Sequence, residues 1–65
     1  MKDGAYILKK DMSLPFGINF KGGKEIVVSN QVVCIDGFPL PAEMQTTIMN
    51  WLIQNQNYLV KTRSW

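Results

Sequence analysis

The stretch FGINFKGGKEIVVSNQVVCID, residues 16–36, decides the fold that the sequence predicts. Phe16, Ile18 and Phe20 alternate with glycine and asparagine, which is the two-residue period of a strand that buries one face. The pair Gly22-Gly23 then supplies the positive φ angles that a tight hairpin needs. The stretch therefore predicts consecutive antiparallel strands joined by short turns.

Working outward from this stretch, we predict four strands at about residues 5–10, 16–21, 24–28 and 31–35, with a loop over residues 11–15. Two-residue turns at Gly22-Gly23 and at Ser29-Asn30 set the register of these strands. Phe20 then lies opposite Glu25, and Val27 lies opposite both Ile18 and Val32.

This register places apolar side chains on both faces of the middle strands. One face holds Phe16, Ile18, Phe20, Val27, Val32 and Cys34, and the other holds Ile26, Val28, Val33 and Ile35. A sheet that is apolar on both sides must be covered twice or curl into a small barrel.

A C-terminal helix is predicted from about residue 41 to residue 56, because Pro41 suits the first helical position and Glu43 the first turn. One stripe of this helix is expected to face the sheet, with Trp51 buried at its centre: Met44, Ile48, Trp51 and Leu52. A second apolar strip consists of Ala42, Met49, Ile53 and Val60, with Gln45 and Gln56 as its polar edge. A short C-terminal tail is expected after the helix.

The predicted fold class is α+β, a small antiparallel meander of three to four strands with one C-terminal helix packed on it. At 65 residues the chain can build one hydrophobic core, so we expect a single domain over residues 1–65. The layout, short strands with a Phe-x-x-Gly turn and then a helix, resembles small SH3-like barrels and the short accessory proteins of bacterial viruses. The resemblance implies a partly open SH3-like barrel.

Composition argues against catalysis. The chain has no histidine, which removes the commonest general base and metal ligand, and Cys34 is its only cysteine. Cys34 is expected mid-strand, buried and unreactive. The carboxylates are scattered along the chain: Asp3, Asp11, Glu25, Asp36 and Glu43. We therefore predict no enzyme activity, no cofactor and no metal.

Charge and hydropathy limit the partners and the cell compartment that the sequence predicts. Seven Lys and Arg against five Asp and Glu leave +2, which is weak for a protein that binds phosphate backbones. No apolar run reaches the roughly 18 residues of a membrane span. The N-terminus does not have the pattern of a signal peptide. Few cysteines and a leading Met favour a complete short reading frame in a reducing, cytoplasmic setting.

Two further segments have competing interpretations. Gly22-Gly23 between Lys21 and Lys24 can be read as a phosphate-binding loop, but the spacing of such loops is missing and a hairpin turn is favoured. Cations and aromatic rings, which can hold phosphates and stack bases, occur together near the C-terminus: Tyr58, Lys61, Arg63 and Trp65. A basic helix end followed by a tail explains the same residues.

The sequence favours a protein–protein interaction protein, either an accessory subunit of a larger assembly or an inhibitor of a host enzyme, encoded by a phage and acting in the host cytoplasm. Its partner is another protein or a second copy. The predicted contact residues are the unpartnered helix strip, Met49 and Ile53 with Ala42, Gln45 and Gln56. The alternative is single-stranded nucleic-acid binding on the aromatic sheet face. Phe16 and Phe20 separate the two, because rings buried under the helix cannot stack bases.

Overall fold

The computed structural model describes all of residues 1–65 and confirms the α+β class, with more strands than predicted. One helix, α1 (Ala42–Gln54), accompanies two antiparallel sheets and two short 3-10 turns, η1 (Pro15–Gly17) and η2 (Gln56–Tyr58). The strands are β1 (Gly4–Leu8), β2 (Met12–Leu14), β3 (Ile18–Phe20), β4 (Glu25–Ser29), β5 (Val32–Ile35), β6 (Phe38–Pro39) and β7 (Leu59–Ser64).

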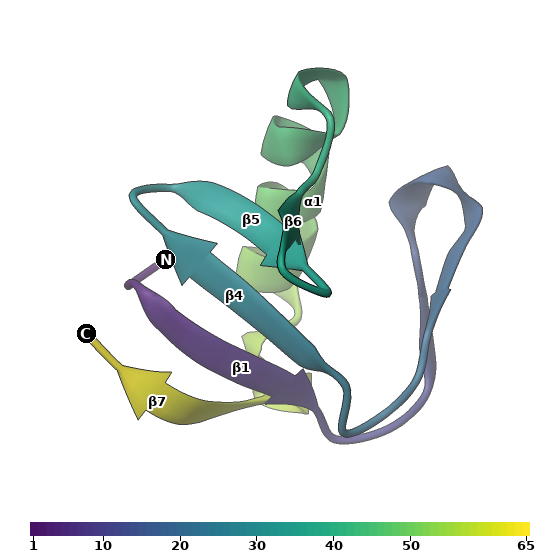
Figure 1. The fold of residues 1–65 in the computed structure, drawn as a ribbon. Helices are drawn as coiled ribbons and strands as arrows, with labels where there is room; N and C mark the ends of the chain where they lie inside the picture. The colour runs from purple at the N-terminus through teal and green to yellow at the C-terminus, as the bar shows by residue number, and fades with distance from the viewer.

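The larger sheet has the strand order β6-β5-β4-β1-β7, and all neighbours are antiparallel (Figure 1). Its two edge strands, β6 and β7, do not pair with each other, so the sheet is open. Helix α1 lies behind one face of the sheet, and the β2–β3 hairpin stands to the side (Figure 1).

The predicted pairing of residues 16–21 with residues 24–28 is wrong. β3 pairs with β2, so that Met12 lies opposite Phe20, while β4 pairs with β1. The predicted loop over residues 11–15 thus contains a strand. The reason is the Pro15–Gly17 turn, in which Phe16 has φ 67° and cannot continue an extended strand. The Phe16 ring is 56% exposed.

The glycine pair turns the chain from the hairpin to the main sheet, so it is a turn but not the hairpin that the sequence predicts. The Gly23 N–H donates to the Leu8 carbonyl at 2.8 Å. A Cβ at Gly22 would come within 2.9 Å of the Lys10 backbone, so no other residue fits this crossing without a shift.

The β4–β5 turn consists of Asn30 and Gln31, both at positive φ, and not of the predicted Ser29-Asn30 pair. Val27 therefore lies opposite Cys34, two residues away from the predicted partner Val32. A slip of two residues leaves each side chain on its predicted face. Val28 and Val33 share the inner face and are fully buried.

The expected C-terminal tail is strand β7. It pairs antiparallel with β1, with Leu59 opposite Leu8 and Val60 opposite Ile7. β1 and β7 approach each other closely at Gly4, where a Cβ would collide with the carbonyl oxygen of Arg63. The helix ends at Gln54, two residues before the predicted end, because the Asn55 side chain donates to the Trp51 carbonyl at 2.8 Å and its backbone N–H bonds the last turn.

The core lies between the inner face of the sheet, α1 and the hairpin. Its buried members are Tyr6, Leu8, Leu14, Phe20, Ile26, Val28, Val33, Ile48, Met49 and Leu52. Met49, predicted outside the core, is 9% exposed, and Trp51, predicted buried, is half-buried. Helix α1 contacts β5 and η1, and Met49 lies beside Gln45 and near Gln31 of the β4–β5 turn, so the buried stripe of the helix extends toward Met49.

The orientation of α1 predicts different costs for two identical substitutions. Ile48→Ala should lower the free energy of unfolding by about 2–5 kcal/mol, because Ile48 is 0% exposed and a cavity would remain. The matched control Ile53→Ala, at a side chain 42% exposed, should cost less than about 1 kcal/mol. Urea unfolding of both variants checks this, and equal costs would contradict the helix orientation.

Candidate functional site

The face of the sheet opposite α1 has no helix or strand over it (Figure 1). Strand alternation and the observed register identify its side chains, since Ile26, Val28 and Val33 point inward and their neighbours point outward. We call this surface the outer sheet face. Its apolar members are Ile7, Val27, Val32, Cys34 and Val60, and its charged members are Glu25 and Arg63.

The outer sheet face is apolar to a degree that is unusual for a surface open to water. Val32 is 39% exposed and Val60 is 41% exposed, while Ile7, Val27 and Cys34 are half-buried. Antiparallel sheets that keep one face in water normally carry polar side chains on that face. The sequence predicts a sheet that is covered on both faces or curled into a small barrel. In the structure, other elements of the chain cover one face only.

An ion pair crosses the outer sheet face. Arg63 on β7 places Nη2 3.1 Å from both carboxylate oxygens of Glu25 on β4, which requires its side chain to pass over β1. Ala5, on β1 beneath this bridge, is 0% exposed. Both partners are largely exposed, so the pair adds little stability. The two opposite charges cancel, so the outer sheet face carries no net charge.

The residues of the predicted contact strip do not form one surface. Met49 is buried and Gln45 is half-buried, whereas Ala42, Ile53 and Gln56 are exposed. Gln56 lies beyond the helix in η2, and its side chain donates to the Ile53 carbonyl at 3.1 Å. A role of these residues in binding stays a prediction, and the strip is not continuous because its middle residue belongs to the core.

Gln45 has an internal role that sequence reasoning missed. Its Oε1 accepts from the Val33 N–H at 2.8 Å, and its Nε2 donates to the carbonyls of Val33 at 3.0 Å and of Leu40 at 2.9 Å. β6 pairs only with Cys34 and Ile35, so Val33 has no strand neighbour on that side. The side-chain amide therefore replaces a neighbouring strand residue and closes this edge of the sheet.

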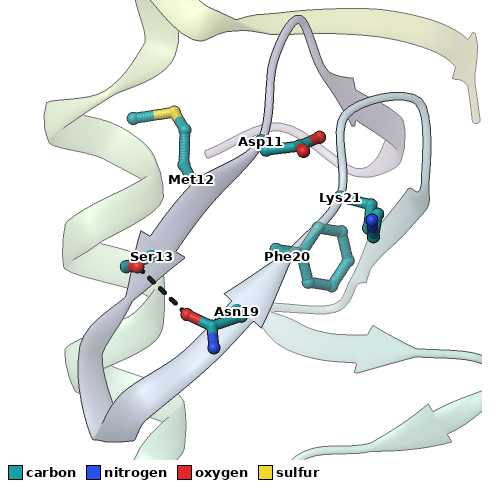
Figure 2. Close-up of a pocket in the computed structure, with 6 residues that line it drawn as sticks. All are labelled: Asp11, Met12, Ser13, Asn19, Phe20 and Lys21. Atoms are coloured by element: carbon teal, nitrogen blue, oxygen red, sulfur yellow. Dashed lines mark hydrogen bonds between the residues drawn. The ribbon is translucent and has the colours of Figure 1, made fainter.

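A hollow of about 340 Å³ lies on the β2–β3 hairpin (Figure 2). Its polar groups bond to the chain itself: the Ser13 hydroxyl donates to Asn19 Oδ1 at 3.1 Å, and Asp11 Oδ1 accepts from the Gly22 N–H at 2.8 Å. These bonds hold the hairpin and its exit turn in place.

The other sequence candidates are dispersed. Lys24 pairs with Asp36 at 3.0 Å and does not join Lys21 in a cradle for an anion. No group of three or more His, Cys, Asp or Glu side chains is placed to hold a metal ion. Cys34 is half-buried on the outer sheet face, so its predicted burial is wrong.

The rings expected to stack bases are not on an open sheet face. Phe20 is 3% exposed within the core, and Phe16 lies on η1, away from the main sheet. The C-terminal cations lie on β7, where Arg63 lies over the Trp65 ring at 5.5 Å and Lys61 over the Tyr6 ring at 5.7 Å.

Comparison of the chain with protein families, with curated proteins and with solved structures gives no match. The single helix is too short and too polar to cross a membrane.

Gln45→Ala should lower the free energy of unfolding by about 1–3 kcal/mol, because it leaves the Val33 N–H without its acceptor. The control Gln54→Ala removes the same side chain from an exposed position on the same helix and should change stability by less than about 0.5 kcal/mol. Denaturant unfolding measures both. Faster hydrogen exchange at Val33 in Gln45→Ala alone would locate the loss, and equal stability of the two variants would contradict this role.

The Tyr6 phenol should make the stability of the fold depend on pH in alkaline solution. Burial, with a smaller effect of Asp3, raises the pKa of its phenol above the ordinary value of about 10, and the hydroxyl donates to the Lys2 carbonyl. Above about pH 10 the unfolded chain loses this proton first, so stability should fall as pH rises toward the folded-state pKa. Tyr6→Phe should show a smaller fall than the parent in unfolding measured from pH 9 to 11. An identical fall would remove Tyr6 as its source.

Proposed function

We propose that this protein is a small non-catalytic interaction protein whose contact surface is the outer sheet face. The observation that carries the proposal is an apolar sheet face with no element of its own chain over it. Full burial of a valine contributes roughly 1.5–3 kcal/mol. Val32 and Val60 are 39% and 41% exposed, so covering each supplies a part of that amount, and several together supply a driving force for association.

The occupant that we propose for the outer sheet face is a second copy of the chain. The Glu25–Arg63 pair neutralises the face, so two copies can approach without repulsion between like charges. Two-fold dimers are the commonest oligomers, and they require a surface that is complementary to itself. Two twisted antiparallel sheets meet this requirement by packing face to face at about 10 Å.

The area of the face agrees with a dimer of modest affinity. A standard interface buries roughly 800 Å² on each partner, which is about one fifth of the 4093 Å² surface of this chain. The molecule measures 27 × 25 × 21 Å, so one broad face supplies an area of that order. A contact of this size with few hydrogen-bonding groups favours reversible association.

The biological setting stays a prediction. An accessory subunit and an inhibitor of a host enzyme both use a small, non-catalytic chain with one dominant contact face, and the resemblance to SH3-like barrels and to phage accessory proteins favours this class. The nucleic-acid alternative is weakened because Phe20 lies in the core and cannot stack a base.

Val32→Lys should raise the dissociation constant for self-association by at least about tenfold, because it places an ammonium group within the proposed contact. Val32 is 39% exposed in the single chain, so the fold should persist. Sedimentation velocity over a concentration series measures the effect. The matched control is Ile53→Lys on the helix, where the side chain is 42% exposed and no change in association is expected.

Cys34 provides a second measurement of the same contact. Alkylation of its half-buried thiol should slow as the protein concentration rises, because the dimer covers the outer sheet face. A chain that stays monomeric at millimolar concentration, or that associates equally well with Val32→Lys, would overturn the proposal.

A further inference from the structure

The two edges of the main sheet differ in how they meet solvent. At the β5–β6 edge, Gln45 and the Leu40 N–H occupy the Val33 backbone groups, and Pro39 has no N–H to offer. At the other edge, β7 runs for six residues, from Leu59 to Ser64, with no neighbour on its outer side (Figure 1). One edge is closed and the other is open.

β7 is available as a template for another strand. An edge strand presents a row of unpaired backbone N–H and C=O groups, and a further extended chain can bond to them. The strand has one irregularity, a register shift between its pairings with Ala5 and Tyr6, and the Thr62 hydroxyl stabilises it by donating to the Ala5 carbonyl at 3.2 Å. This bond points toward β1 and leaves the outer backbone of β7 unused.

Basic residues gather along this open edge. Lys9 donates its N–H to the Tyr58 carbonyl at 2.8 Å, and Lys10 lies over the Tyr58 ring at 4.6 Å, just before β7 begins. Lys2 and Lys61 line one hollow beside β7. With Arg63, five of the seven basic residues lie on this side of the molecule, together with two acidic residues, Asp3 and Glu25. The rest of the chain has two basic and three acidic residues.

This charge determines which occupant fits. A second copy pairing through β7 would bring two identical basic edges together, and like charges across a strand pair are destabilising. An acidic strand would meet complementary charge. A nucleic acid would need free aromatic faces to stack its bases, but the rings of Tyr58, Tyr6 and Trp65 each have a cation of this chain over one face.

We propose that the open edge of β7 is a docking site for an extended acidic segment of another protein, which adds to the main sheet as a sixth strand. The backbone of β7 supplies the hydrogen bonds, and Lys2 and Lys61 supply the charge selection. The proposal does not depend on the outer sheet face, so either surface can fail in experiment without the other.

The probe is a fluorescent six-residue peptide that alternates glutamate and valine, matched to the length of β7. Its anisotropy titration with the intact protein should give a dissociation constant at least about tenfold lower than that of the lysine–valine peptide. Binding should weaken as salt rises to about 0.5 M. N-methylation of every second amide, on the edge that faces β7, should abolish binding, and amide chemical-shift changes should centre on residues 59–64.

Two variants test the charge selection. Lys61→Gln should weaken binding of the acidic peptide by about three- to tenfold. The matched control Lys21→Gln, at an exposed position on the hairpin side of the molecule, should leave binding unchanged, as should Val32→Lys.

Equal binding of the acidic and basic peptides, undiminished binding after N-methylation, shift changes away from β7 or no binding at all would each overturn the proposal. Tighter binding of a single-stranded oligothymidylate than of the acidic peptide, lost in Lys61→Gln, would also overturn it and would assign the edge to nucleic acid.

Discussion

The antiparallel pairing of β1 with β4 on one side and β7 on the other is the interaction on which the rest of the structure depends. It joins the first strand of the chain to the last one, so the two ends of a 65-residue sequence stabilise each other. It also places Tyr6 and Leu8 in the core. Gly4 permits the close approach of the Arg63 backbone, and a larger side chain there would force β7 away. Without this pairing the outer sheet face would lose Val60 and Arg63, and the sheet would have a different open edge.

Other elements of the chain cover one face of this sheet and leave the opposite face open, which is why we place the proposed contact surface on the sheet. Helix α1 and the β2–β3 hairpin both lie on the inner side, and together they bury Ile26, Val28 and Val33. The outer side keeps its valines in water. The edges repeat the asymmetry, because Gln45 closes one and nothing closes the other. The two open surfaces differ in chemistry: the face is apolar and neutral, and the edge is polar and basic. The partners that we propose for the two surfaces therefore differ in chemistry.

Much of the local structure could be predicted from residue patterns, because alternation and helical spacing are local properties. The division of β4 and β5 into faces is one example, since Ile26, Val28 and Val33 do share a buried face although the turn and the register were displaced by a residue or two. The helix is another, with Ile48 and Leu52 in the core as predicted. Errors arose where a segment packs against a neighbour that is distant in sequence. Met49 lies near Gln31 of the β4–β5 turn, and residues 59–64 form a strand because β1 offers them an edge.

The sequence by itself determined the class of the fold, the apolar character of both sheet faces and the position of the helix, because strand and helix periods are properties of neighbouring residues. It also determined that Gly22-Gly23 is a turn, since glycine adopts a positive φ, as Gly23 does, without the steric cost that a side chain brings. Only the tertiary structure decided which strands pair, which face stays open and which edge Gln45 closes. These depend on contacts between segments up to 60 residues apart, such as Gly4 with Ser64, and no local pattern specifies which of several compatible apolar surfaces meet.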